Sequence, residues 1–274
     1  MKCFSLSFSD YEECYDSIIV LLEQMGNVEE LTLFLLVMRV NSTYIDGIKL
    51  SDDILIDMPR LKKFTFSINT GIIRENIAEL DFSSNEYIQS TFIGKGYGQV
   101  GSYVYSCATR DWGRCHIYSL PYRFERFFDL NNSFQFQGQI FDKVQCLTMM
   151  DERPFQHEFF QLTSVYFPFL KRLTILNENA QQHKQDSSRL IAFSQLVYLN
   201  LYDAHTDYAE QLLLTKNTDL PCLSDLFIRY ESLTILTNNF TIDQMYLNCT
   251  QLKKLHIKEP FVRPETFHSY FPSF

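Results

Sequence analysis

The amino-acid sequence predicts an α/β fold built from stacked repeats, because one short phrase returns along the chain at a nearly constant spacing. The phrase is L-x-x-L-x-L, with other apolar residues in place of some leucines. Its first apolar position falls at Val28, Leu61, Val144, Leu170, Leu196, Leu223 and Leu252. From Leu170 onward the steps are 26, 27 and 29 residues, and leucine-rich repeats are about 20–29 residues long. We therefore predict an irregular leucine-rich-repeat-like solenoid (a horseshoe), with a parallel sheet on its concave side and helices or irregular returns on its convex side.

The repeats predict a single array over residues 1–274, because one repeat cannot bury its apolar face alone and must stack on its neighbours. Phe4 and Leu6 lie 27 residues before Leu31 and Leu33. We therefore expect the chain to begin inside a repeat strand, as a piece of a longer protein or a truncated gene model. Residues 68–140 break the rhythm and are expected to form an irregular, insertion-like stretch.

Helices are predicted between the strands, where apolar residues share one face. The first spans residues 11–25, with Asp10 as its amino-terminal cap and Gly26 at a left-handed stop. Residues 51–58 predict a short return that ends before Pro59, since the residue before a proline avoids the helical conformation. Four further helices are predicted on the convex side, at residues 154–167, 186–193, 207–216 and 264–270.

The residues between the leucine-type positions are expected to face away from the core, because side chains alternate between the two faces of a strand. In the later repeats they are rich in Tyr, Arg, Lys and His, and Tyr and Arg are enriched at protein interfaces. We predict a protein-binding surface on the concave face that consists of Arg172, Thr174, Tyr198, Asn200, Tyr202, Phe227, Arg229, Lys254, His256 and Lys258. The alternative is an ordinary solvated face, in which threonines occur because they suit strands.

Composition narrows the class of partner and the compartment. Hydrophobic residues make up 46% of the chain, which is ample for a core, and the net charge of −9 disfavours nucleic acid or an anionic membrane as the main partner. No signal peptide opens the chain, and no apolar run reaches the roughly 18 residues that span a bilayer. The seven cysteines form no C-x-x-C pair, which predicts free thiols and a reducing, cytoplasmic or nuclear, compartment. The four N-x-[ST] sequons are accordingly interpreted as chance matches.

A glycine-rich segment at residues 94–101 contains G-x-G-x-x-G at Gly96, Gly98 and Gly101. A dinucleotide-binding loop of this kind follows a strand and opens a helix, whereas residues 103–106 are β-like. We therefore interpret the segment as a surface loop. A nucleotide-binding enzyme that uses it is the remote alternative.

Two patterns fall short of a metal site. Residues 157–161 are close to the zinc motif H-E-x-x-H, but Gln161 replaces its second histidine. Cys107, Cys115 and His116 lack a fourth ligand at a recognisable spacing. The sequence therefore predicts no metal ligands.

Asp151 and Glu152 are adjacent carboxylates, which we interpret as solvated loop residues rather than an acid–base pair. No serine or cysteine stands in the sequence context of a known nucleophile. The sequence therefore predicts a protein that is not an enzyme, with no catalytic residues and no cofactor.

Beyond the repeat phrase, the chain resembles the leucine-rich-repeat portion of a large family of F-box proteins. The likeness is carried by HIYSLPY (116–122), DERPFQHEFF (151–160), FPFLKRLT (167–174), YLNL (198–201), AHTDY (204–208), NFT (239–241) and YFP (270–272). In such proteins an amino-terminal F-box of L-P-x-E-[IL] type binds the ubiquitin-ligase adaptor, and the repeats select the substrate. This chain shows no such opening, so the resemblance implies the substrate-recognition half.

We therefore expect a non-catalytic protein–protein interaction module that resembles the substrate-recognition part of an F-box ubiquitin-ligase subunit. Its expected partner is an unidentified protein substrate, and a ubiquitin-ligase adaptor would bind only if an F-box lies upstream of Met1. The alternative is a stand-alone repeat scaffold, or a truncated relic without ligase attachment.

Overall fold

A computed structural model describes residues 2–73, 83–107, 112–136, 138–182, 190–241, 246–259 and 261–271. The fold is mixed α/β with parallel strands and helices, as the sequence predicts. The chain divides into two compact units, Met1–Phe124 and Glu125–Phe274, and each has a main sheet of its own. The predicted array thus distributes its strands over two main sheets.

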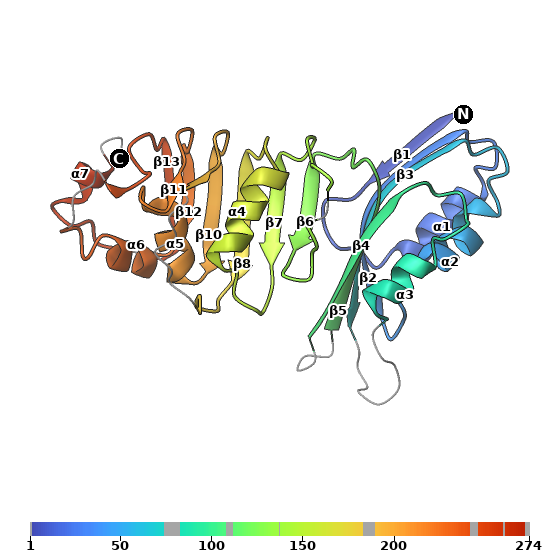
Figure 1. Ribbon diagram of the computed structural model, residues 1–274, viewed down its shortest axis with the longest axis horizontal. Helices are drawn as coiled ribbons and strands as arrows, with labels where there is room; N and C mark the ends of the chain where they lie inside the picture. Colours follow the sequence, from blue (N-terminus) through green and yellow to red (C-terminus); the bar gives the residue numbers. More distant parts are fainter. Residues whose placement is uncertain are drawn as a thin grey trace. The chain divides into compact units, whose positions relative to one another are not determined.

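The first unit is a five-stranded sheet with helices on one side. Its elements are β1 (Cys3–Ser7), α1 (Tyr15–Glu23), β2 (Glu30–Val40), α2 (Gly47–Leu50), the π-helical turn η1 (Ser51–Leu55), β3 (Lys63–Ile73), α3 (Asn85–Ser90), β4 (Val100–Cys107) and β5 (Trp112–Ser119). The strand order is β1-β2-β3-β5-β4. In Figure 1, α1, α2 and α3 lie on the same side of this sheet.

The repeat phrase sets the register of the parallel part of this sheet. Phe4 pairs with Leu31, and Leu31 with Phe64. Leu31 is fully buried and belongs to a core that also contains Ile18 and Leu22 of α1. The periodic apolar residues therefore fill the space between strands and helices, as leucine-rich phrases do in a stacked array.

The first helix is shorter than predicted. It begins at Tyr15, its amino-terminal cap Cys14 accepts no side-chain hydrogen bond, and Gly26 does not have a positive φ. The predicted start was wrong because Glu12 forms a parallel bridge to Val37, which keeps this part of the chain extended. Capping residues and apolar periodicity are local features of the sequence, so they cannot predict a contact between residues this far apart.

The insertion-like stretch predicted at 68–140 begins inside β3 and contains α3 and a β-hairpin. β5 pairs antiparallel with both β3 and β4, so the predicted parallel sheet is found in this unit only for β1, β2 and β3. The β4–β5 pair is antiparallel because only a short connection separates Cys107 from Trp112 along the sequence. Parallel neighbours need a crossover of about a dozen residues or more.

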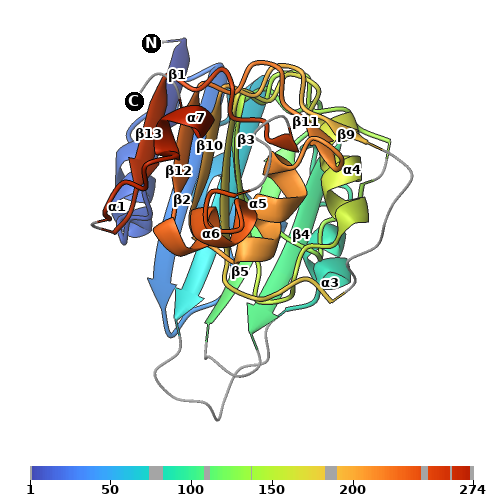
Figure 2. The same cartoon turned by 90° about the vertical axis from the view of Figure 1, so that its left-hand side faces the viewer.

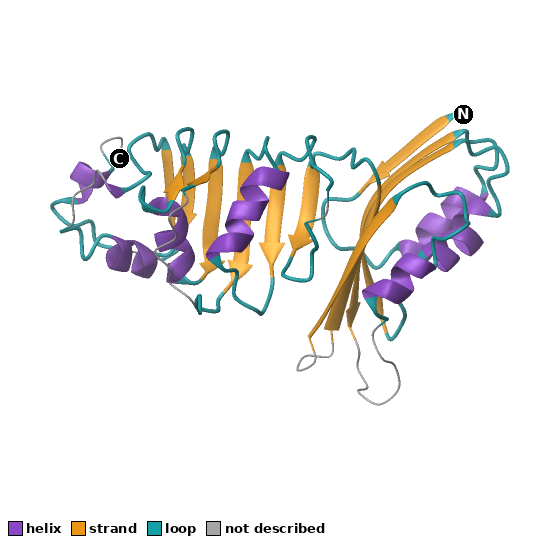
Figure 3. Ribbon diagram, viewed as in Figure 1, coloured by secondary structure: helices purple, strands orange, loops and turns teal. Residues whose placement is uncertain are grey.

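The second unit has a six-stranded parallel sheet, and helices occur in several of the connections between successive strands (Figure 3). Its elements are β6 (Arg126–Leu130), β7 (Cys146–Met150), α4 (His157–Tyr166), β8 (Arg172–Asn177), β9 (Ile191–Ala192), β10 (Tyr198–Ala204), α5 (Thr206–Leu213), β11 (Thr218–Asp219), β12 (Asp225–Ile228), α6 (Tyr230–Leu236), β13 (Lys254–Ile257) and α7 (Phe267–Tyr270). The main strand order is β13-β12-β10-β8-β7-β6, and β9 pairs with β11 in a small second sheet.

Successive leucine phrases pair as neighbouring parallel strands in this unit. Leu147 lies in register with Leu173, and the row continues through Leu199, Leu226 and Leu255. The spacing of 26 to 29 residues therefore corresponds to one strand and one return, and the predicted parallel pairing is confirmed here.

The helices of this unit match two predictions well. α4 falls inside predicted residues 154–167 and α5 overlaps 207–216, whereas α7 covers only the end of 264–270. The helix predicted at 186–193 lies partly outside the described residues. Its described end is a strand, because Ile191 N donates to Asn217 O at 3.1 Å and so pairs with the neighbouring return.

Candidate protein-binding face of the second sheet

The second sheet has an apolar face and a polar face. Leu173, Leu199 and Leu226 are buried on the apolar face, and Figures 1 and 2 show α4 and α5 together on one side of this sheet. We call the opposite side the polar face. It carries the residues predicted for protein binding: Arg172, Thr174, Tyr198, Asn200, Tyr202, Phe227, Arg229, Lys254, His256 and Lys258. Strand alternation therefore places these side chains where the sequence predicts them.

A row of contacting rings crosses three strands of the polar face. The Phe227 ring on β12 lies 4.9 Å from the Tyr198 ring on β10 and 4.0 Å from His256 on β13, centroid to centroid. Phe227 and His256 stack with an interplanar angle of 10°. Tyr202 meets Phe227 edge-on at 5.4 Å. Aromatic pairs in such geometries contribute stabilisation in addition to that from burying their surface. The row therefore forms an ordered apolar strip on a polar surface.

Arg172 extends this row to β8. Its Cζ lies 3.7 Å from the centroid of the Tyr198 ring, which is a cation–π contact. A guanidinium carries its N–H donors in a rigid planar fork, and contact with a ring limits the freedom of the side chain. Arg172 is itself exposed, so those donors face solvent.

Two other cations of the polar face, Arg229 and Lys258, have carboxylate partners. Arg229 Nη2 lies 2.7 Å from Glu178 Oε1, and its Nε donates to the Tyr202 carbonyl at 2.7 Å. Lys258 Nζ lies 2.6 Å from Asp203 Oδ1. These ion pairs are exposed and each contributes on the order of 0–1 kcal/mol, so they orient side chains more than they stabilise the fold.

The sequence prediction missed the carboxylates that pair with these cations. Glu178 follows the end of β8 and reaches Arg229, which lies far along the chain. Asp203 lies where the register between β8 and β10 shifts. The repeat phrase does not extend to either position, and the acidic residue types were the only available signal.

A local irregularity in β10 holds Tyr202 on the polar face. Asn200 Oδ1 accepts a hydrogen bond from Tyr202 N at 3.0 Å, and the register shifts between Asn200 and Asp203. Bulges of this kind re-aim side chains. Asn200 thus has a structural role, whereas Thr174 lies in register with Thr148 as part of a threonine row.

Two groups on this face have shifted pKa values. Burial raises the pKa of Tyr202, and Tyr198 and Glu259 act in the same direction. Burial likewise raises the pKa of the Cys146 thiol on β7, against the lowering effect of the Arg172 guanidinium. With raised pKa values, neither the Tyr202 hydroxyl nor the Cys146 thiol is a ready nucleophile or base near neutral pH.

Residues 94–99 of the glycine-rich segment lie between α3 and β4, and Val100 and Gly101 begin β4 itself. Gly94, Gly96 and Gly98 have φ of 74°, 77° and 75°, which favours glycine at each. The order of elements is helix, loop, strand, the reverse of the order in which a helix amino terminus receives phosphates. The surface-loop interpretation agrees with this order.

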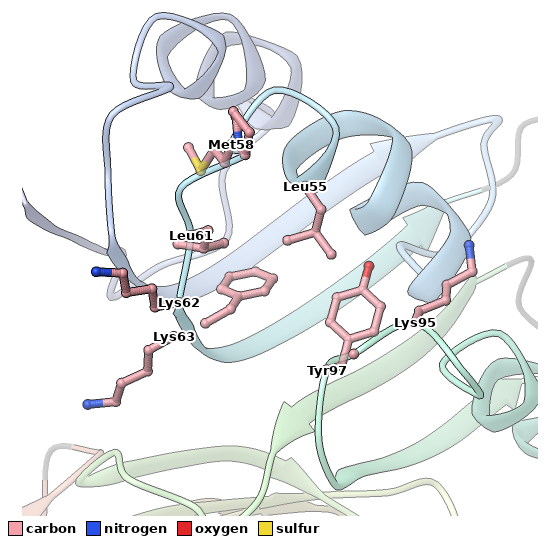
Figure 4. A pocket seen from close by; sticks show the side chains of 10 residues that line it. Leu55, Met58, Leu61, Lys62, Lys63, Lys95 and Tyr97 are labelled. Atoms are coloured by element: carbon pink, nitrogen blue, oxygen red, sulfur yellow. The ribbon is translucent and has the colours of Figure 1, made fainter.

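A pocket of about 350 Å³ beside this loop is lined in part by Lys95 and Tyr97. In Figure 4, Lys62 and Lys63 extend away from Tyr97. Their ammonium groups lie 2.7 and 3.5 Å from carboxylates of Glu29 and Glu30, respectively. Two of the lysines that line the pocket, Lys62 and Lys63, are thus paired with carboxylates, which weakens its case as a phosphate site.

The predicted near-miss zinc patterns lie in packed surroundings. His157 is buried, with Nδ1 3.3 Å from Gln211 Oε1. Cys115 belongs to the apolar core of the first unit, while the adjacent His116 points to the other face of β5. The Cys107 side chain lies outside the described residues. Across the described ranges, no three His, Cys, Asp or Glu residues are grouped as metal ligands.

Asp151 is not the solvated loop residue that the sequence suggests. It is buried, and its carboxylate accepts hydrogen bonds from Asn132 N at 2.7 Å and Arg153 N at 2.8 Å. A buried carboxylate persists when backbone donors satisfy it. Asp151 therefore fastens the loop after β7 to the loop after β6.

No protein-family model matches the chain, and no curated protein or solved structure compared with it matches either. Within the described part of the chain, no helix is both long enough and apolar enough to cross a bilayer. The polar face must therefore be interpreted from its own geometry.

Proposed function

We propose that this protein is a non-catalytic protein–protein interaction module that binds its partner through the polar face of the second sheet. The observation that carries the proposal is the contact row Arg172, Tyr198, Phe227 and His256, which spans four adjacent strands. Tyr and Arg dominate binding energy at protein interfaces. A rigid strip of such residues suits recognition of a protein surface.

We further propose that the protein is a leucine-rich-repeat-like solenoid and that the polar face is its concave side. Support comes from the repeat spacing and from the parallel register of β7, β8, β10, β12 and β13. Stacked repeats characteristically present an extended binding surface of this kind.

The biological role that we propose is substrate recognition for a ubiquitin ligase. It rests on the likeness of the sequence to the repeat portion of F-box proteins. In this proposal the polar face selects a protein substrate, and attachment to the ligase requires an F-box upstream of Met1. The alternatives are a stand-alone scaffold, a relic that binds nothing, and, more remotely, a nucleotide-binding enzyme that uses residues 94–101.

The test is a fourfold alanine variant of Arg172, Tyr198, Tyr202 and Arg229. We expect proteins captured by the wild-type chain from cell extract to be lost, since interface hot spots of about 2 kcal/mol or more correspond to roughly 30-fold weaker binding each. Circular dichroism should show an intact fold, because these side chains lie outside the apolar core.

A matched control replaces two arginines and two tyrosines that are exposed elsewhere, namely Arg60, Tyr87, Arg123 and Tyr246. We expect the control variant to capture the same proteins as the wild-type chain. Equal capture by the fourfold face variant would move the binding site away from the polar face, and no reproducible capture by any variant would favour the relic.

A further inference from the structure

Positive charge gathers at one end of the polar face. Arg126, Cys146, Arg172 and Tyr198 lie in register on the adjacent strands β6, β7, β8 and β10. Neighbouring strands lie about 4.8 Å apart, so the two arginines flank the small cysteine at roughly twice that spacing. Lys171 precedes Arg172 and is also exposed.

The charged residues around Cys146 act on the pKa of its thiol. Arg172, Arg126 and Lys171 each lower the pKa of Cys146, and only Glu125 opposes them among the charged groups. Burial outweighs the cations for the thiol itself. Arg126 and Arg172 therefore lie on either side of Cys146 in the sheet, on a chain whose net charge is −9.

Arg172 differs from Arg229 and Lys258 because its contact is with an aromatic ring and not with a carboxylate. Arg229 and Lys258 are neutralised by Glu178 and Asp203, whereas Arg172 lies on the Tyr198 ring. The contact with the Tyr198 ring holds the guanidinium before any ligand arrives, so less side-chain freedom is lost when its N–H donors bind an anion. A planar fork of donors matches a carboxylate with two parallel hydrogen bonds.

We propose that Arg172, held against the Tyr198 ring, binds a carboxylate side chain of an acidic segment in the partner protein. Charge complementarity to the arginine requires that this segment contain Asp or Glu. The adjacent row of rings around Phe227 binds an apolar side chain of the same segment. This inference rests on the proposed function, because it specifies the partner of the same face.

The experiment selects peptides from a random linear library displayed on phage, with the full chain as bait. We expect selected peptides to be enriched in Asp and Glu, and synthetic copies to bind less tightly at higher salt. Arg172→Ala should weaken binding about 10- to 100-fold, the range for a hydrogen bond to a charged group. Arg172→Lys should restore part of it, and Arg60→Ala, which removes an exposed arginine elsewhere, should leave it unchanged.

Three outcomes would overturn the inference. Peptides that bind equally well to Arg172→Ala but fail to bind Phe227→Ala would refute anion recognition and leave the polar face as the binding surface. Peptides unaffected by either substitution would refute the proposed function as well. Enrichment of Lys and Arg in the selected peptides would contradict the proposed charge of the partner.

Discussion

His116 on β5 is a buried histidine held between hydroxyl groups. Its Nε2 lies 2.9 Å from Ser67 Oγ and its Nδ1 lies 3.2 Å from the Tyr103 hydroxyl. Burial lowers its pKa from 6.5 to about 3. A serine beside a histidine can form a nucleophile and base, but a histidine with so low a pKa is a weak base near neutral pH. This trio is therefore best described as a polar network that ties strands together.

The first prediction concerns the acid stability that this burial implies. Between pH 6.5 and about 3 the unfolded chain protonates His116 while the folded chain does not. The free energy of unfolding should therefore fall as the pH is lowered, by roughly 1.4 kcal/mol per pH unit from this group. Urea unfolding of the wild-type chain at a series of pH values would measure the slope.

The matched comparison is His116→Gln, which removes the titrating ring. Its unfolding free energy should depend less steeply on pH over the same range, whatever its absolute stability. Parallel curves for the two proteins would mean that His116 is accessible to protons in the folded state.

At the same scale, the candidate site shows what residue patterns can and cannot predict. Strand alternation was enough to place Tyr198, Phe227 and His256 on one face, because each strand follows the same leucine register. The ion-pair partners Glu178 and Asp203 were not predictable, since their positions depend on where strands end and shift register.

Among the elements, α4 shows most directly how a return segment is held to the sheet. Phe160 is fully buried and its ring lies 6.0 Å from that of Tyr208 on α5. Val165, five residues further along the same helix, is 59% exposed. The two residues therefore report on opposite sides of one helix.

The second prediction follows from this contrast. Phe160→Ala should lower the free energy of unfolding by about 3–5 kcal/mol, because it removes buried surface and leaves a cavity. Val165→Ala should change it by no more than about 0.5 kcal/mol, as expected for a surface position. Urea unfolding monitored by circular dichroism would measure both, and similar losses would place α4 differently from the arrangement described here.

Helix boundaries mark the limit of sequence reasoning at this scale. The periodic residues of α4 and α5 predicted those helices because their apolar faces pack locally against the sheet. The start of α1 was missed because Glu12 is drawn into a bridge with Val37. The described end of the helix predicted at 186–193 is a strand, because Ile191 pairs with the chain near Thr218.

For the molecule as a whole, the cysteines test the expectation of free thiols. Cys3 and Cys222 are exposed, whereas Cys115 and Cys249 are buried. Burial raises the pKa of Cys249 to about 12 and raises that of Cys115 as well. Since the thiolate is the reactive form, burial and pKa both suppress reaction of these two residues.

The third prediction is a difference in labelling between these pairs. An alkylating reagent at pH 8 should modify Cys3 and Cys222 rapidly in the native chain, and should reach Cys115 and Cys249 only when urea unfolds it. Peptide mapping by mass spectrometry would identify the sites. Rapid native labelling of Cys249 would show that the second unit opens readily, and resistance of Cys3 after unfolding would point to a disulfide.

The sequence by itself determined the parallel stacking of the second sheet, because a repeat of near-constant length buries its leucines only when neighbouring copies pair in register. It also determined which side chains share the polar face, since strand alternation is a local property. The tertiary structure alone decided that β5 pairs antiparallel with β3 and that the strands form two main sheets. It also decided that Arg172 lies on the Tyr198 ring while Arg229 and Lys258 pair with carboxylates. Those outcomes depend on contacts between residues far apart in the chain, which local periodicity does not encode.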